Sequence, residues 1–218
     1  SARTTITFWR PMNLKNRKGA LLIVSGPSGT GKGTIMDEYF KRYSGDNSFL
    51  SVSVTTRAPR CGEKEGVNYY YKTREEFEYL IANDGLAEWA EFCGNYYGTP
   101  KQPVMDMMSA GKDVILEIEV QGAMKVKKSF KDAACVFVLP PSFEELRRRL
   151  IERHTESTEV IDRRIERAKQ EVLLIDNYDY ILINDNLDAA VEAFRCIVKA
   201  EGQKVGKNIN IINEVCGL

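Results

Sequence analysis

Seven residues from Gly26 to Lys32 have the types and spacing of a loop that binds nucleotide phosphates. They read Gly-Pro-Ser-Gly-Thr-Gly-Lys and match the pattern G-x-x-x-x-G-K. The glycines allow backbone N–H groups to converge on a phosphate, a following helix adds positive potential at its N-terminus, and Lys32 would bridge the terminal phosphates. The alternative interpretation of Gly26–Lys32 is a glycine-rich turn that binds no phosphate and whose lysine is simply solvated. The apolar run before the loop and the helical pattern after it argue against that alternative.

The residue after the lysine departs from the usual pattern and bears on the metal. Phosphate loops place Ser or Thr there, with a hydroxyl that reaches Mg²⁺, but this chain has Gly33 followed by Thr34. Because Mg²⁺ keeps several water ligands in many sites, we expect phosphates, water and carboxylates elsewhere in the chain to hold it, and we predict no direct protein ligand. The residues expected to bind the nucleoside triphosphate here are Gly26, Pro27, Ser28, Gly29, Thr30, Gly31, Lys32, Gly33 and Thr34.

Two arginines directly after the second predicted strand indicate another anion site. Arg57 and Arg60 lie three residues apart around a proline, and two planar guanidinium groups at that spacing suit one phosphate. Tyr69 and Tyr97 could add hydroxyl donors. Most arginine pairs in loops are simply solvated, but ligands of open α/β sheets bind at the carboxyl ends of strands, where this pair lies. The sequence therefore predicts an acceptor phosphate beside the phosphate loop.

The elements around these motifs alternate between strands and helices. Apolar runs predict strands at 20–25, 49–54, 113–118, 134–139 and 180–183. Amphipathic spacing predicts helices at 32–43, 102–110, 121–130, 142–152, 158–175 and 187–201. Residues 55–100 are richer in Gly and Tyr, and Thr73 and Glu76 have capping-box spacing for a helix at 73–83. This order predicts an α/β fold: a parallel sheet with helices on both faces, interrupted by a small mixed insertion.

Composition excludes several classes of protein. The 31 Lys and Arg residues balance 31 Asp and Glu residues, so general affinity for nucleic acid is not indicated. No apolar run approaches the roughly 18–20 residues of a membrane span. Five scattered cysteines and a single histidine favour neither a disulfide framework nor a Cys/His zinc site, and a cytoplasmic location is expected. The basic segment 1–18 is interpreted as an N-terminal extension or tag remnant rather than a transit peptide.

Several further motifs, in order along the chain, resemble those of guanylate kinases. Besides the phosphate loop they are Ser51-Val-Ser-Val-Thr-Thr-Arg-Ala-Pro-Arg60, Gly94-Asn-Tyr-Tyr-Gly98 and Leu116-Glu-Ile-Glu-Val-Gln-Gly122. The resemblance continues through Arg149, Arg153-His-Thr-Glu156 and Ile183-Asn-Asp185, and covers about residues 19 to 202. It implies transfer of the γ-phosphoryl group of ATP to GMP, and to dGMP, giving ADP and GDP with Mg²⁺ and closure of a lid.

The resemblance also implies how the chain is organised. A guanylate kinase-like domain is expected at 19–202, with a core at 19–50, 101–141 and 176–202. Its GMP-binding part is expected at 51–100 and its helical lid at 142–175, with a C-terminal tail at 203–218. The expected partners are the small-molecule nucleotides ATP and GMP, with neither nucleic acid nor membrane, and the protein is expected to be a monomer.

The family's functional residues carry over by position. The GMP phosphate ligands fall on Arg57, Arg60, Tyr69 and Tyr97, and the guanine ligands on Ser53, Glu88 and Thr99. The lid arginines fall on Arg149, Arg153 and Arg164, and the adenine-side residues on Asn184 and Asp185. The resemblance implies that Lys32, Arg60, Arg153 and Arg164 act in catalysis. Glu119, in the acceptor site, stands where the family usually has the shorter Asp.

Two other functions stay open from the sequence. The Gly33-Thr34 ending resembles adenylate kinases, but a carboxylate at Glu88 suits guanine, which offers two adjacent donors where adenine offers an acceptor. Some guanylate kinase-like domains have lost catalysis and bind phosphopeptides. Those domains tend to lack the loop lysine or the lid arginines, whereas this chain has Lys32, Arg153 and Arg164.

Overall fold

A five-stranded parallel sheet forms the centre of the molecule, in a computed structural model that describes residues 17–92, 94–152 and 157–216. The strand order is β2-β7-β1-β8-β9, and all neighbouring strands are parallel. The strands are β1 (Leu21–Ser25), β2 (Ser48–Leu50), β7 (Asp113–Glu117), β8 (Ala134–Leu139) and β9 (Tyr180–Ile183). The apolar runs β1 and β8 lie in the middle, where both faces of the sheet are covered. The predicted α/β fold is confirmed.

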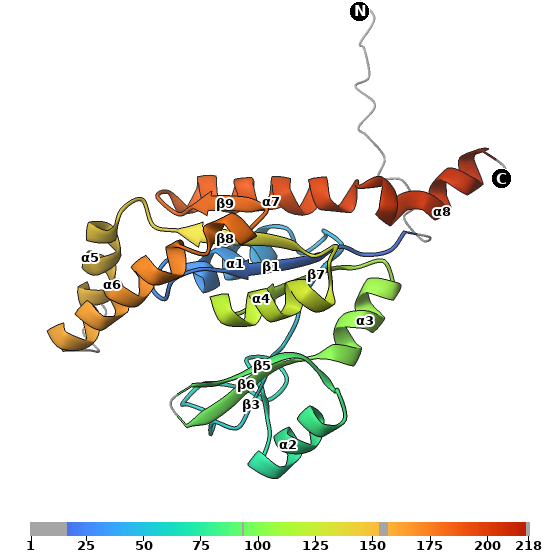
Figure 1. Ribbon diagram of the computed structural model, residues 1–218. Helices are drawn as coiled ribbons and strands as arrows, with labels where there is room; N and C mark the ends of the chain where they lie inside the picture. Colours follow the sequence, from blue (N-terminus) through green and yellow to red (C-terminus); the bar gives the residue numbers. More distant parts are fainter. Residues whose placement is uncertain (1–16, 93, 153–156, 217–218) are drawn as a thin grey trace, which may run out of the picture.

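Helices cover both faces of this sheet (Figure 1). Because successive strand residues point to opposite faces, Leu22 and Val24 of β1 pack against α1 (Lys32–Arg42) and α7 (Leu187–Gly202). Leu21 and Ile23 pack on the other face, against α3 (Lys101–Ser109) and α4 (Val120–Ser129). Helix α4 lies between this sheet and the smaller one (Figure 1), so it belongs to the wall that the two parts share.

The smaller sheet has four strands in the order β4-β3-β6-β5. They are β3 (Val54–Thr55), β4 (Tyr70–Tyr71), β5 (Leu86–Phe92) and β6 (Asn95–Pro100), and α2 (Arg74–Ala82) packs on them through Phe77. The predicted capping box is present, with Thr73 and Glu76 bonded reciprocally. The single strand predicted at 49–54 is wrong. Its first part is β2 of the large sheet and its end is β3 of the small sheet, because the chain crosses from one sheet to the other through Ser51–Ser53.

Two charged helices stand at one end of the core (Figure 1). Helices α5 (Phe143–Glu152) and α6 (Thr158–Val172) pack on each other through a small apolar cluster of their own, which includes Leu146, Leu150 and Ile161. The predicted helix at 158–175 ends earlier, at Val172. There the N–H groups of Leu173 and Leu174 bond to carbonyls three residues back, and a short 3₁₀ helix, η1 (Ile175–Asn177), follows. Within the described residues, every helix is too short or too polar to cross a membrane.

The first described residues lie beside β7 and against the junction of α7 and α8 (Val205–Cys216). The buried guanidinium of Arg17 donates to Asp113 at 2.5 Å and to the carbonyls of Gly111 and Gly202 at 3.2 and 3.1 Å. The N–H of Lys18 donates to the carbonyl of Lys207 in α8. Neither the anchoring role of Arg17 nor helix α8 was predicted from the sequence.

Candidate active site

The phosphate loop connects β1 to α1, as predicted. Three of its glycines have a positive φ, 139° at Gly26, 95° at Gly29 and 88° at Gly31, which L side chains rarely adopt. A Cβ at Gly26 would lie 2.3 Å from the carbonyl oxygen of Val138, so this turn also needs the missing side chain for space. The Lys32 ammonium donates to the carbonyls of Gly26 and Pro27 at 2.6 and 3.1 Å. The lysine therefore lies over its own loop, where terminal phosphates would be bound.

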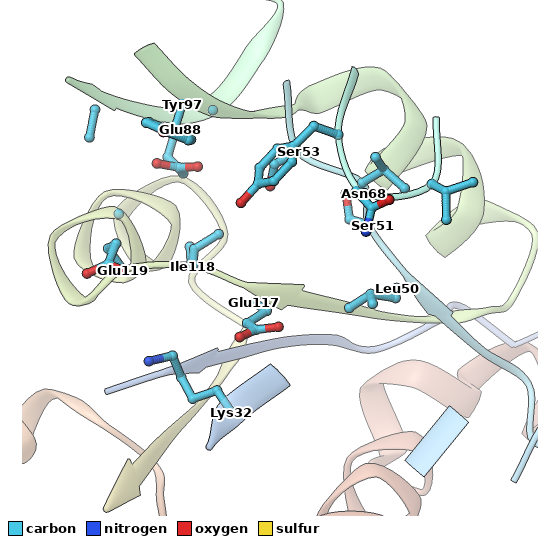
Figure 2. A pocket seen from close by; sticks show the side chains of 16 residues that line it. Lys32, Leu50, Ser51, Ser53, Asn68, Glu88, Tyr97, Glu117, Ile118 and Glu119 are labelled. Atoms are coloured by element: carbon cyan, nitrogen blue, oxygen red, sulfur yellow. The ribbon is translucent and has the colours of Figure 1, made fainter. Parts of the chain in front are cut away.

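A cavity of about 400 Å³ lies between the large sheet and the small sheet. Figure 2 shows Glu88 entering it from the small sheet and Lys32 bordering it at the opposite end, with Glu117 of β7 between them. Ser53, Tyr69, Tyr97 and Glu119 also line it. Five of the predicted acceptor-side residues therefore share one cavity with the lysine of the phosphate loop.

A β-bulge aims Glu88 into this cavity. In the β5–β6 ladder Leu86 pairs with Pro100 but Glu88 pairs with Thr99, so β5 contains one extra residue between them. Leu86 and Trp89 consequently face the small core around Phe77, and Glu88 points the other way, toward α4. Its Oε1 accepts a hydrogen bond from the Thr99 hydroxyl at 2.8 Å. Burial raises the pKa of this carboxyl above its ordinary value, while the Thr99 bond and Lys125 oppose that rise.

The predicted arginine pair is arranged around the carboxylate of Glu63, which no sequence motif indicates. One Arg57 nitrogen donates to both oxygens of Glu63, at 2.9 and 3.0 Å, and its guanidinium lies 5.4 Å from the centre of the Tyr69 ring. The backbone N–H of Arg60 and the hydroxyl of Tyr71 donate to the same carboxylate at 2.7 and 2.8 Å. With Arg57 as the largest contributor, these contacts lower the pKa of Glu63 to about 2.

The charged helices α5 and α6 contact the phosphate loop through two arginines, one of them by way of Asn184. Arg164 of α6 donates to the Ser28 hydroxyl at 3.4 Å. Arg149 of α5 donates to the carbonyl of Asn184 at 2.9 Å, and the Asn184 amide donates to the carbonyl of Thr30 in the loop at 2.8 Å. Arg149 and Asn184 also line a second hollow, together with Gly29, Gly31, Thr34, Glu152, Asp185 and Leu187. Arg153, predicted to act in catalysis, lies outside the described residues.

Comparison with known proteins identifies the family that shares this arrangement. The family model for guanylate kinase matches residues 18–201. This chain belongs to the guanylate kinase family. It is 49% identical over 188 residues to a guanylate kinase of Halalkalibacterium halodurans (86% of this chain, 91% of that protein) and 50% identical over 189 residues to one of Bacillus cereus (86% and 91%). The crystal structure of guanylate kinase from Anaplasma phagocytophilum superposes with a TM-score of 0.73 at 34% identity, covering 91% of this chain and 95% of that one.

The site residues expected for a guanylate kinase are not equally close to the cavity. Thr99 is connected to it through its bond to Glu88, and Arg57 does not line it but lies over the ring of Tyr69, which does. The Arg60 side chain is exposed and does not line the cavity, so only its backbone joins the Glu63 cluster. Glu63 follows Arg57 by six residues and Arg60 by three. These intervals match no motif and do not distinguish Glu63 from any other acidic residue in a loop. Identifying Glu63 from the sequence would have required a reason to expect an acidic residue beside the two arginines that are predicted to bind phosphate.

Glu117, the last residue of β7, and Glu119, two residues later, have different surroundings. Burial raises the pKa of the Glu117 carboxyl, and the nearby Lys32 ammonium opposes the rise. Glu119 is exposed and accepts a contact of 3.4 Å from Arg167 of α6. The longer side chain at position 119 thus reaches from the cavity wall to the charged helices.

The raised pKa of Glu88 predicts that this residue lowers the stability of the ligand-free protein at neutral pH. A carboxyl whose pKa is higher in the folded chain than in the unfolded chain contributes stability below the unfolded value, and that stability is lost as the pH rises through the folded value. We therefore expect Glu88→Gln to raise Tm at pH 7. Thermal unfolding measured from pH 7 down to pH 4 should show this advantage shrinking. An advantage that grows on acidification would contradict the prediction.

Proposed function

We propose that the cavity binds GMP, with guanine at Glu88 and the phosphate toward Arg57 and Lys32, for transfer of the γ-phosphoryl group of ATP. The reaction is that of a guanylate kinase, ATP + GMP to ADP + GDP. The observation that carries the proposal is the pairing of two groups in one cavity of about 400 Å³: a buried carboxylate at one end and the phosphate-loop lysine at the other. We propose dGMP as a further acceptor.

Base selection is assigned to Glu88. The N1–H and 2-amino groups of guanine are adjacent donors, and an ionised carboxylate has only acceptors, so the two match. Adenine would set its N1 lone pair against the same carboxylate, and a site built to hydrogen-bond one group strongly rejects an analogue that lacks it. Thr99 holds one carboxylate oxygen, and Ser53 lines the cavity beside it, which supports roles for both in the guanine site.

The acceptor phosphate is assigned to the cluster around Arg57. Tyr69 and Tyr97 line the cavity with their rings 6.1 Å apart, and Arg57 lies over the first of them. Charge-assisted bonds from guanidinium groups to phosphate are about twice as strong as neutral ones. The exposed Arg60 side chain is proposed to turn toward the phosphate when GMP binds, since its backbone is already fixed to the same carboxylate as Arg57.

The triphosphate is assigned to the loop 26–34 and to the arginines of α5 and α6. Phosphoryl transfer needs mainly positioning and stabilisation of the charge that spreads over the transferred group. Arg164 already contacts Ser28 in the loop, and Arg149 is bonded to Asn184, which in turn holds the loop at Thr30. We propose that these helices close as a lid over both nucleotides and exclude water as a competing acceptor. Arg153 and Asp185 are proposed to act there, on the reactive phosphate and the adenine side.

Mg²⁺ fits this site without a cage of protein ligands. Within the described residues, no group of three acidic, histidine or cysteine side chains could hold a metal alone. A Cβ at Gly33 would lie 3.7 Å from Glu117 Oε1, so a carboxylate borders the place where other phosphate loops have a hydroxyl. Phosphate oxygens and water would hold the ion, with Glu117 beside them. When bound, Mg²⁺ would neutralise part of the phosphate charge.

The cytoplasmic location and the monomeric state stay predictions from the sequence.

The space beside Gly33 predicts that a hydroxyl can be added there. A contact of 3.7 Å is ordinary van der Waals distance, so Gly33→Ser should fold and place its hydroxyl near the metal. We expect kcat at saturating Mg²⁺ within about threefold of wild type, and a lower Mg²⁺ concentration for half-maximal activity. Titration of activity with Mg²⁺ at fixed ATP and GMP measures both. A folded but inactive Gly33→Ser protein would show that this loop requires a bare backbone at that position.

A coupled assay of ADP formation tests the proposed function directly. Wild-type protein is given ATP and Mg²⁺ with GMP, with dGMP or with AMP as the acceptor. The proposal expects turnover with GMP and dGMP and a kcat/KM for AMP lower by at least about 10³-fold. Comparable turnover with AMP would instead favour the adenylate kinase-like alternative. Binding of GMP without ADP formation would favour a domain that has lost catalysis.

A further inference from the structure

Gly122, in the first turn of α4, stands directly behind the carboxylate of Glu88. A Cβ at this glycine would lie 2.7 Å from Glu88 Oε2 and 3.2 Å from its Cδ. Side-chain Cβ atoms essentially never approach other atoms closer than 3.0 Å, so an alanine at this position would force the Glu88 carboxylate to shift. The contact joins two parts of the molecule, since α4 belongs to the core and β5 to the small sheet. Gly122 is therefore where the core touches the base-reading residue.

The carboxylate has little freedom to move away from α4. The bulge in β5 fixes the direction in which Glu88 leaves the strand, and Thr99, its cross-strand partner, holds Oε1 at 2.8 Å. Thr99 is itself buried. A side chain at position 122 would thus have to break the bond to Thr99 or turn the carboxylate into the cavity. Either movement changes how its two oxygens face the cavity.

We propose that Gly122 is a specificity-determining position: its bare backbone provides the space that lets Glu88 hold both carboxylate oxygens toward the two donors of guanine. The inference rests on the proposed function, because it assigns guanine to Glu88. Gly122 acts through the carboxylate and is a positioning residue. The discrimination it controls is that between guanine and hypoxanthine, which retains N1–H but lacks the 2-amino group. Displacing one carboxylate oxygen removes the advantage that the second donor gives GMP over IMP.

Gly122→Ala tests this inference, with kcat/KM measured for GMP and for IMP. We expect kcat/KM for GMP to fall at least about tenfold, mainly through KM, and the ratio of GMP to IMP to fall about fivefold or more. Alanine favours a helix more than glycine does, so Tm should not fall through loss of helix stability. The ratio of the two substrates does not depend on the fraction of folded enzyme, so it remains informative even if some protein is lost.

A matched control comes from α8. Gly206 is also in a helix, and a Cβ there would meet nothing within 4 Å, so Gly206→Ala should leave kcat/KM and the GMP-to-IMP ratio unchanged. A double-mutant cycle supplies the second control. In a Glu88→Ala background the side chain that Gly122 accommodates is gone, so adding Gly122→Ala should change the ratio less than twofold.

The outcomes separate this inference from the function on which it rests. Wild-type protein that does not phosphorylate GMP would overturn both. If Glu88→Ala lowers kcat/KM for GMP but folded Gly122→Ala keeps the wild-type GMP-to-IMP ratio, the guanine site stands and the role of Gly122 is overturned. An equal effect of Gly122→Ala with and without Glu88 would also overturn it, since the glycine would then act on something other than that carboxylate.

Discussion

Replacing Lys32 with alanine is expected to lower kcat by at least about 10²–10³-fold while leaving the affinity for GMP within about threefold of wild type. The lysine lies over the phosphate loop, bonded to the carbonyls of Gly26 and Pro27, at the end of the cavity opposite Glu88 (Figure 2). In the proposed site the charge of Lys32 acts on the phosphoryl group that is transferred, whereas binding of guanine is assigned to Glu88 and binding of the GMP phosphate mainly to the cluster around Arg57. Steady-state kinetics and calorimetric titration with GMP measure the two effects separately.

Lys41→Ala is the matched control, because Lys41 lies on the same helix and forms an exposed contact of 3.4 Å with Glu38. Exposed pairs of this kind contribute about 0–1 kcal/mol to stability, so this variant should retain wild-type kinetics. A Lys32→Ala enzyme with near wild-type kcat would remove the phosphate loop from the mechanism. Loss of GMP affinity as large as the loss of kcat would show that the lysine binds the acceptor as well.

The parts of the site that were predictable from sequence are those whose chemistry requires particular residue types at short spacing. The phosphate loop needs a backbone that only glycine adopts, and Gly26 and Gly31 have the positive φ that this implies. The capping box at Thr73 is equally local, since both of its hydrogen bonds lie within three residues. The central strands were predictable because β1 and β8 are buried on both faces and read as continuous apolar runs.

The features missed depend on contacts between segments far apart in the chain. Ser51–Ser53 carry no local signal that the chain leaves one sheet for another, so β2 and β3 were predicted as a single strand. The bulge that turns Glu88 away from Leu86 appears only in the pairing with β6. The anchoring role of Arg17 depends on Asp113, 96 residues away. Such contacts are set by tertiary packing, which local propensity does not encode.

Arg57→Ala is expected to lower kcat/KM for GMP by at least about 10²-fold, more than the loss of one phosphate ligand would explain. The variant removes a guanidinium and leaves behind the carboxylate that it neutralised. Arg57 is the main reason that the pKa of Glu63 is about 2, and without the arginine that pKa returns toward its ordinary value of 4.5. Glu63 therefore stays ionised at neutral pH, and it repels the incoming phosphate dianion.

Arg74→Ala is the control. It removes an exposed arginine of the same small sheet region, paired with Glu78, and should keep wild-type kcat/KM.

The repulsion is separable from the lost contact by a second substitution. Glu63→Gln removes the charge while keeping a side-chain oxygen for the Arg60 N–H and the Tyr71 hydroxyl. In the Arg57→Ala background we expect it to recover about tenfold in kcat/KM, whereas in the wild-type background it should lower kcat/KM, because Arg57 loses the carboxylate that orients it. If Glu63→Gln raises kcat/KM in the Arg57→Ala background and lowers it in the wild-type background, the Glu63 carboxylate orients Arg57 and its charge is neutralised by Arg57. If Glu63→Gln lowers activity equally in both, the carboxylate serves the fold of the loop alone, and the extra loss in Arg57→Ala has another cause.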